Sequence, residues 1–439
     1  MKKNRLKTLL AGLLLAAMLS GCQNAQPNEP AEDTAEEVTT PAQQTSEPQS
    51  LQINGAALDQ YVVNYNKKDG TGGAEAFAYF NEKIGEAYGV TLKNSTAIKD
   101  DRCEIMIAQD AGDQTIAEAF AQNPEGLIGV SGKRIFFLGA NYAALCQVID
   151  AFLAKAEGAG AEKTIRLTAT EAVALKKESF KAMSYNLRVD IDDNGRSKNF
   201  IADMANTVLG EEVDVFGTQE TSTSIFDALR AKLPDYNYYR GMIYEGAGQI
   251  SNAVFWKAEK FKLVEQGHRF MSDTPTVKSK YEDSNAYRGF SYVILESRET
   301  GNRFLFISVH TDYRGPETVR VAQLKVLTAF LKEKAGNDFP AIIVGDFNST
   351  PTKNAVTSFD DDNPRLGMTL KVAKTKGDTG STLVGSEFTT RHDPSYVYDY
   401  IFITTDRIIA EYYSVVVNFV DGKSPSDHLP VVSTLTLYK

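Results

Sequence analysis

The sequence predicts a layered α/β fold for most of its 439 residues. In residues 177–439, short apolar runs of strand length alternate with stretches of helical periodicity, and this alternation is typical of layered α/β architectures. Hydrophobic residues make up 42% of the chain and aromatic residues 10%, enough to bury a sizeable core. On a prior of about 150 residues per domain, we expect two or three domains.

The first 50 residues read as a targeting signal and a linker. Residues 1–21 join a basic start, MKKNRLK, to an apolar stretch shorter than a membrane-spanning helix needs. The following Leu-Ser-Gly-Cys resembles the cleavage site of a bacterial lipoprotein signal, which implies lipidation of Cys22. An ordinary secretory signal with a chance cysteine is the alternative. Residues 22–50 have six acidic, no basic and no aromatic residues, which predicts a disordered acidic tether.

These features predict an extracytoplasmic protein that is anchored to the bacterial cell membrane by a lipid. Two or more acyl chains on one cysteine give stable anchoring, whereas a single chain does not. An exported chain permits a disulfide. However, Cys103 precedes a predicted strand and Cys146 lies in a predicted helix, so we expect two separate thiols. We also expect a monomer.

Residues 51–172 predict a small α/β domain. The expected elements are strands over 61–66, 103–108 and 126–140, the last a pair around a Ser-Gly-Lys turn, and helices over 72–89 and 141–156. This order resembles the accessory domain that precedes the catalytic barrel of hexosaminidases and alpha-glucuronidases. The resemblance implies a non-catalytic spacer or a module on the glycan side. The alternative is a structural domain with no ligand of its own.

Residues 177–439 predict the larger domain. Strands are expected over 180–188, 213–220, 251–257, 290–297, 303–312, 341–351, 396–404 and 431–439, and helices over 196–209, 222–233 and 317–334. From residue 173 onward the chain holds 32 basic and 35 acidic residues. This near balance weakens the case for sequence-specific nucleic-acid recognition, which normally has a strongly basic footprint. The balance of charge is still compatible with an enzyme that binds phosphate through a metal ion.

Polar side chains recur where the predicted strands of this domain end. Asp346 and Asn348 follow the apolar run Ala341–Val344, and side chains two apart on a strand point the same way. They would present a carboxylate and an amide to one point. The chain has only four histidines, and two of them occupy such positions. One such case would be a structural polar group, but a series predicts a site: Asn186, Glu220, His310 with Asp312, Asp346 with Asn348, Asp399, and Asp427 with His428.

The motifs around these residues resemble the successive motifs of the endonuclease/exonuclease/phosphatase superfamily. In order they are SYNLR, TQE, SVHTDYRGPETVR, GDFNSTP, YDYIFI and SDHLPV, and they span nearly all of 177–439. The resemblance implies a four-layer sandwich of two packed mixed β-sheets flanked by helices. It also implies attack of water on a phosphoester with the help of Mg²⁺ (or Mn²⁺). The implied substrates are nucleic acid, phospholipid head groups, or inositol or sugar phosphates.

The same resemblance assigns roles to the acidic residues. Glu220 would be the metal ligand, since Mg²⁺ prefers oxygen ligands and needs only one or two carboxylates. Asp427 would support that metal or a second one. Asp346 would orient or deprotonate the attacking water. Asp399 would fix the tautomer and position of His428.

The remaining residues would contact the phosphate. His428 would stabilise the charge that builds on phosphorus, and His310 would hold a phosphate oxygen or assist the leaving group. Asn186 and Asn348 would donate amide hydrogens to phosphoryl oxygens or help the metal shell. Many relatives carry a glutamate just before the strand that here reads QISNAVFW, where this chain has Gln249, and in some relatives that glutamate supports the histidine that matches His310.

Other readings stay open beside this one. The protein could be a sphingomyelinase-like phospholipid phosphodiesterase, or a catalytically inactive surface binding protein. Asp312 is expected to cap a loop and Trp256 to lie in the core. The acidic run 360–362 is expected in a solvated loop, and the tyrosines of 236–239 are expected to serve packing more than stacking against a substrate.

Overall fold

A computed structural model describes residues 49–68, 70–189, 195–243, 250–336 and 339–439. The predicted signal peptide, Cys22, Gln249 and nearly all of the predicted tether lie outside these ranges. In the described part of the chain, no helix has both the length and the apolar character that crossing a membrane requires.

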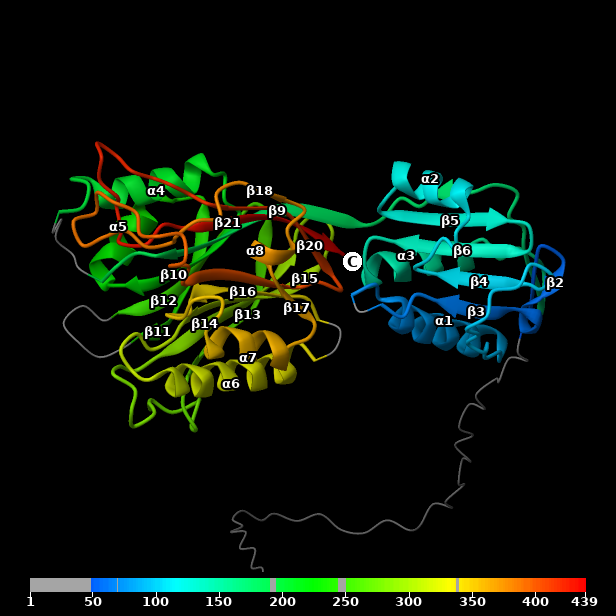
Figure 1. The fold of residues 1–439 in the computed structure, drawn as a ribbon, viewed down its shortest axis with the longest axis horizontal. Coiled ribbons are helices and arrows are strands. Elements are labelled where there is room, and N and C mark those ends of the chain that lie inside the picture. The colour runs from blue at the N-terminus through cyan, green and yellow to red at the C-terminus, as the bar shows by residue number, and fades with distance from the viewer. Residues whose placement is uncertain (1–48, 69, 190–194, 244–249, 337–338) are drawn as a thin grey trace, which may run out of the picture. The chain divides into compact units, whose positions relative to one another are not determined.

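Residues 50–172 form two small sheets with three α-helices (Figure 1). The elements are β1 (Ser50–Ile53), β2 (Ala56–Ala57), the 3-10 turn η1 (Leu58–Gln60), β3 (Val62–Tyr65), α1 (Gly73–Tyr88), β4 (Glu104–Ile107), α2 (Gln114–Gln122), β5 (Gly126–Ser131), β6 (Arg134–Gly139), α3 (Tyr142–Leu153), β7 (Glu162–Ile165) and β8 (Glu171–Ala172). The strands run in the orders β2-β1-β7 and β3-β4-β6-β5-β8. Helix α2 is absent from the prediction because its apolar stripe is short: Ile116 is its one buried residue, and Ala119 and Phe120 are only partly buried. Within the described residues, Cys103 and Cys146 form no disulfide, as expected.

Residues 177–438 form two large mixed sheets. The elements are β9 (Lys177–Asn186), α4 (Phe200–Gly210), β10 (Val215–Thr221), α5 (Thr223–Lys232), β11 (Tyr236–Ile243), β12 (Ser251–Lys257), β13 (Phe261–Phe270), β14 (Gly289–Ser297), β15 (Arg303–His310), α6 (Glu317–Lys334), β16 (Ala341–Asp346), α7 (Asn354–Asp362), β17 (Leu366–Met368), α8 (Thr369–Val372), β18 (Thr375–Lys376), β19 (Asp399–Thr404), β20 (Ile408–Val415) and β21 (Val431–Tyr438). Among the described residues, the strand orders are β11-β12-β10-β9-β21-β20-β18 and β13-β14-β15-β16-β19-β17.

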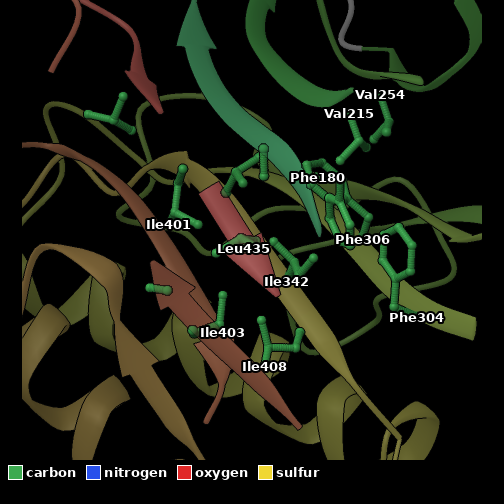
Figure 2. Close-up of a cluster of buried hydrophobic side chains, with 14 of the residues drawn as sticks. Phe180, Val215, Val254, Phe304, Phe306, Ile342, Ile401, Ile403, Ile408 and Leu435 are labelled. Carbon is green, nitrogen blue, oxygen red and sulfur yellow. The ribbon is translucent and has the colours of Figure 1, made fainter. Parts of the chain in front are cut away.

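Three hydrophobic cores show that the larger part has four layers. The central core joins the inner faces of the two sheets, with residues such as Phe180, Phe306 and Leu435 (Figure 2). A second core packs α4 and α5 on the sheet that contains β9, and a third packs α6 and α7 on the sheet that contains β16 (Figure 1). The predicted four-layer sandwich of two mixed sheets flanked by helices is therefore confirmed. Trp256 lies in the central core, as expected.

The differences from the predicted elements have local causes. Strands β15 and β16 end earlier than predicted, at His310 and Asp346, and β19 begins later, at Asp399, because these polar residues lie at the edge of the core. Strand β13 escaped prediction because most of its side chains are exposed or half-buried. The acidic run 360–362 was predicted as a loop. It forms the last turn of α7, where Asp360 pairs with Lys371 at 2.9 Å.

The aromatic packing of the central core gives a first prediction. The Phe304 ring is fully buried and lies 5.1 Å from the Phe180 ring and 5.3 Å from the Phe261 ring. Phe304→Ala should lower the free energy of unfolding by about 3–5 kcal/mol, because it removes buried surface and leaves a cavity. Urea unfolding measures this loss. Leu263→Ala, on the exposed face of β13, is the control and should cost less than about 1 kcal/mol. Equal losses in the two variants would contradict this packing.

Candidate active site

Three of the predicted site residues lie in a row across neighbouring strands. In the parallel pair β15 and β16, His310 is opposite Asp346, and in the antiparallel pair β16 and β19, Asp346 is opposite Asp399. All three side chains are buried. The row therefore results from strand register, which sets residues far apart in the sequence side by side.

The other sheet supplies two more predicted residues. Asn186 ends β9, and Glu220 lies near the end of the neighbouring strand β10. The Asn186 amide Nδ2 donates to Asp346 Oδ2 at 3.0 Å and to Glu220 Oε1 at 3.3 Å. Glu220 has a positive φ of 52°, an unusual backbone conformation for a non-glycine residue, and its Oε2 accepts the Val189 N–H at 3.2 Å. One amide thus joins carboxylates from the two sheets.

Asp399 and His428 form a hydrogen-bonded pair. Asp399 Oδ2 lies 2.8 Å from His428 Nδ1, and His428 Nε2 lies 3.7 Å from Asp346 Oδ2. Burial alone would lower the pKa of His428. The charges of Asp399 and Asp346 outweigh burial and raise that pKa well above its ordinary value. His428 is therefore a cation whose Nε2 faces Asp346.

Asp346 is a carboxyl group with an unusually high proton affinity. Its Oδ1 accepts the Asn348 N–H at 2.8 Å and its Oδ2 accepts the Asn186 amide. Burial raises its pKa from 3.8 to about 7; the charge of Asp399 adds to this rise, while His428 opposes it. A carboxyl group that titrates near neutral pH can both take up and release a proton there.

His310 is neutral and held by an arginine that the sequence analysis did not select. Arg288 Nη1 lies 3.1 Å from His310 Nδ1, and a guanidinium can only donate. Nδ1 is therefore the acceptor, and the proton sits on Nε2. Burial, then the charges of Arg288 and His428, lower the pKa of His310 well below its ordinary value. Nε2 lies 3.5 Å from Asp346 Oδ2 and makes no hydrogen bond among the described residues.

Arg288 could have been noticed in the sequence. It directly precedes Gly289, the first residue of β14, so it too is a polar residue at a strand end, like the residues that were selected. It escaped selection because it lies at the beginning of its strand, while most of the selected residues follow theirs. Antiparallel pairing places Gly289 opposite His310, which brings Arg288 to the same edge of the sheet.

The side chains of the other predicted residues mainly contact groups outside the set described above. The Asn348 amide Nδ2 donates to the Thr311 carbonyl at 3.1 Å, so one of its hydrogens is committed to the backbone. Asp427 pairs with Arg188 at 3.2 Å, and among the described residues no hydrogen bond or ion pair joins it to Glu220. Asp312 is buried and accepts the Ser284 hydroxyl and three backbone N–H groups. The expected loop-capping role fits those contacts.

The donor set at this site suits a hard divalent cation. Glu220 is partly exposed, and its Oε1 shares the Asn186 amide with Asp346 Oδ2. Mg²⁺ needs only one or two carboxylates and retains waters, so these oxygens fit it. Asp346, Asp399 and His428 also place ligand atoms within 4.8 Å of one another. Because His428 is protonated and bonded to Asp399, that group serves proton chemistry better than metal binding.

Comparison with known proteins identifies the family. Residues 183–428, more than half of the chain, match the Endonuclease/Exonuclease/phosphatase family. The chain belongs to this family. Members of the endonuclease/exonuclease/phosphatase family are phosphoester hydrolases and generally depend on divalent metals, so the coarse prediction of a hydrolase acting on phosphate esters is confirmed.

Solved structures of the endonuclease/exonuclease/phosphatase family show the same fold. A family protein from Bacteroides thetaiotaomicron shares 26% identity at a TM-score of 0.55, over 60% of this chain and 97% of that one. A mannosyl-6-phosphatase from the same organism shares 27% identity at 0.53, over 58% and 99%. A protein from Bacteroides vulgatus shares 22% identity at 0.53, over 59% and 99%. A search of the curated proteins finds no match.

Proposed function

We propose that this protein is a Mg²⁺-dependent (or Mn²⁺-dependent) phosphoester hydrolase of the nuclease or phosphatase type, anchored to the outer face of a bacterial membrane through Cys22. The observation that carries the catalytic proposal is the position of Asp346. Its buried carboxylate, with a pKa near 7, lies beside the cation of His428 and the N–H of His310. A water-activating base and two groups suited to phosphate oxygens therefore converge on one point.

Each group has a role in this proposal. Asp346 takes the proton of the attacking water, because its pKa is close to neutral pH. His428 stabilises the negative charge that develops on the phosphoryl oxygens, and Asp399 keeps its ring oriented and protonated. The unpaired Nε2–H of His310 donates to a phosphate oxygen or to the leaving group.

The metal site of the proposal is Glu220, with Asp427 as a supporting carboxylate. Mg²⁺ held by these carboxylates would polarise the phosphoryl oxygen and neutralise part of its charge. Asn186 keeps Glu220 and Asp346 at a fixed separation through its shared amide. It therefore couples the metal-binding carboxylate to the base.

A sugar phosphate is the substrate class that the comparisons favour. The mannosyl-6-phosphatase shares 27% identity with this chain, and its name states a sugar phosphate as its substrate. The near balance of charge from residue 173 onward also argues mildly against long nucleic acids. Nucleic acid and phospholipid head groups remain test substrates.

The decisive experiment is a metal-dependence assay on the full chain. The protein is stripped with EDTA and supplied with Mg²⁺ or Mn²⁺, then assayed on mannose 6-phosphate, p-nitrophenyl phosphate, bis-p-nitrophenyl phosphate, plasmid DNA and sphingomyelin. We expect turnover of a phosphate ester that disappears with EDTA, returns with Mg²⁺, and is absent in Asp346→Ala and His428→Ala. Turnover that survives chelation, or that persists in both variants, would overturn the proposed mechanism.

Anchoring is tested separately. Cys22→Ser should move the protein from the membrane fraction to the soluble extracytoplasmic fraction, because it removes the attachment point of the lipid. Wild-type protein found only in the soluble fraction would contradict the anchor without affecting the catalytic proposal.

A further inference from the structure

The active site has a buried cation with no carboxylate at ion-pair distance among the described residues. Arg288 is only 7% exposed, and within the described residues no carboxylate lies close enough to form an ion pair with it. Its Nη1 donates to His310, while its Nε has no hydrogen-bond partner among those residues. A buried charge that is not paired is costly, so such a group calls for an explanation. The charge of Arg288 lowers the pKa of the nearby Asp312, but that carboxylate accepts its hydrogen bonds from four other donors.

A second guanidinium joins Arg288 at an exposed aromatic ring. Tyr313 is 47% exposed, with Arg288 Cζ 5.5 Å and Arg314 Cζ 4.9 Å from its ring centroid. The Arg314 side chain is exposed and has no ion pair within the described part of the chain. Asp312 Oδ1 accepts the Arg314 N–H at 3.0 Å, which fixes the backbone that presents this side chain. We call these residues the Arg288/Tyr313/Arg314 cluster.

The cluster lies one imidazole ring away from the reacting groups. The His310 ring bridges the two, since its Nδ1 faces Arg288 and its Nε2 faces Asp346 at 3.5 Å. Both guanidinium groups contact the Tyr313 ring, so two positive charges gather around one exposed side chain and would attract an anion. Arginine forks are well suited to phosphate oxygens.

We propose that the Arg288/Tyr313/Arg314 cluster is a second anion subsite, which binds a phosphate group of the substrate other than the one that is hydrolysed. This inference rests on the proposed function for the position of the scissile phosphate. The shared chemistry is a second phosphate near the first. It is supplied either by a sugar bisphosphate or by the neighbouring phosphate of a polynucleotide.

Substrate pairs that differ by one phosphate test the proposal. The first pair is mannose 6-phosphate and mannose 1,6-bisphosphate, and the second is the dinucleotide TpT and its 5′-phosphorylated form. Arg314→Ala should raise KM about tenfold for the doubly phosphorylated member of one pair, with kcat unchanged and the other member altered less than twofold. The responding pair identifies the source of the second phosphate. Arg314→Lys should retain part of the effect, because it keeps the charge but loses the fork.

Arg303→Ala is the matched control. Arg303 is an exposed arginine at the other end of β15, where it pairs with Glu296, so its removal makes the same change in net charge. It should alter KM for all four substrates equally, by less than twofold. The proposal is overturned if Arg314→Ala has no effect, or if it affects both members of each pair to the same extent.

Binding without turnover separates this inference from the proposed function. Calorimetry on the metal-free full chain should show that pyrophosphate binds at least about fivefold more tightly than inorganic phosphate, and that Arg314→Ala removes the difference. This result would support the subsite even if no substrate were hydrolysed. Equal affinity for the two anions in the wild-type protein would overturn it, whatever the activity.

Discussion

Asp346→Asn should lower kcat by about 10²–10⁴-fold and, at pH 8 without metal, make the folded protein more stable than the wild type. The activity falls because asparagine cannot accept the proton of the attacking water. The stability rises because a buried carboxylate, costly to ionise, is replaced by a neutral amide of nearly the same shape. Both measurements are needed, since a general disruption of the site would lower both quantities.

The direction of the stability change follows from proton linkage. The pKa of Asp346 is about 7 in the folded chain and near 3.8 when unfolded, so the folded state binds more protons between these values. The wild type therefore loses stability as pH rises through this window, by at most about 4 kcal/mol. The attraction of His428 is already included in that pKa.

The amide has its own cost. Asp346 accepts hydrogen bonds at both oxygens, from Asn348 and Asn186, and an asparagine has only one oxygen to offer. Allowing about 1–2 kcal/mol for that loss, we expect a net gain of at most roughly 2–3 kcal/mol at pH 8 and none at pH 5, where the folded wild-type carboxyl is still protonated. Thermal unfolding of both proteins in EDTA at the two pH values measures this difference in stability.

Asp312→Asn is the matched control for this reversal. Asp312 is also buried, but hydrogen bonds from the Gly315 N–H, the Ser284 hydroxyl and other donors outweigh burial and lower its pKa. Its carboxylate therefore stabilises the fold above the unfolded pKa, and this contribution is lost as pH falls through the lowered value. At pH 8 the control should lose about 1–3 kcal/mol. If both variants lose stability at pH 8, the assignment of Asp346 as a destabilising base is wrong.

Much of the fold was predictable because its signals are local. Helix α6 has the predicted bounds, 317–334, because its buried residues repeat at helical spacing. The polar residues at strand ends were also visible, since Asp346 and His310 each follow a largely apolar run. The sequence pattern thus selected Asn186, Glu220 and the rest of the set as candidates, and the structure places Asn186, Glu220, Asp346, Asp399, His310 and His428 close together.

The remaining features depend on contacts between distant segments. Only the register of β14 against β15 brings Arg288 to His310, and the absence of a carboxylate at ion-pair distance from Arg288 among the described residues is a property of the packed fold. Likewise, the pKa of Asp346 is set by burial and by Asp399, which is 53 positions away in the chain but opposite it in the sheet. Strand β13 was missed because its outward side chains follow no apolar alternation.

Asp399 and His428 should act as one unit, so that losing both costs no more than losing His428 alone. His428→Ala should lower kcat/KM by about 10²–10³-fold, because the cation that faces the phosphoryl oxygens is removed. Asp399→Asn should lower it by a similar factor, since the ring loses the charge that keeps it protonated. In the double variant the two losses should not multiply.

The pH profile distinguishes this coupling from simple structural damage. Without the charge of Asp399, burial and the remaining charges set the pKa of His428, so it should fall toward or below its ordinary value. Because the proposed mechanism requires protonated His428, the alkaline decline of kcat/KM in Asp399→Asn should move to lower pH. Asp399→Glu keeps the negative charge and should therefore restore part of kcat/KM at alkaline pH. Multiplicative losses with an unshifted profile would instead make Asp399 a buried structural carboxylate, and His428 would then owe its protonation to the charges of Asp346 and Asp427.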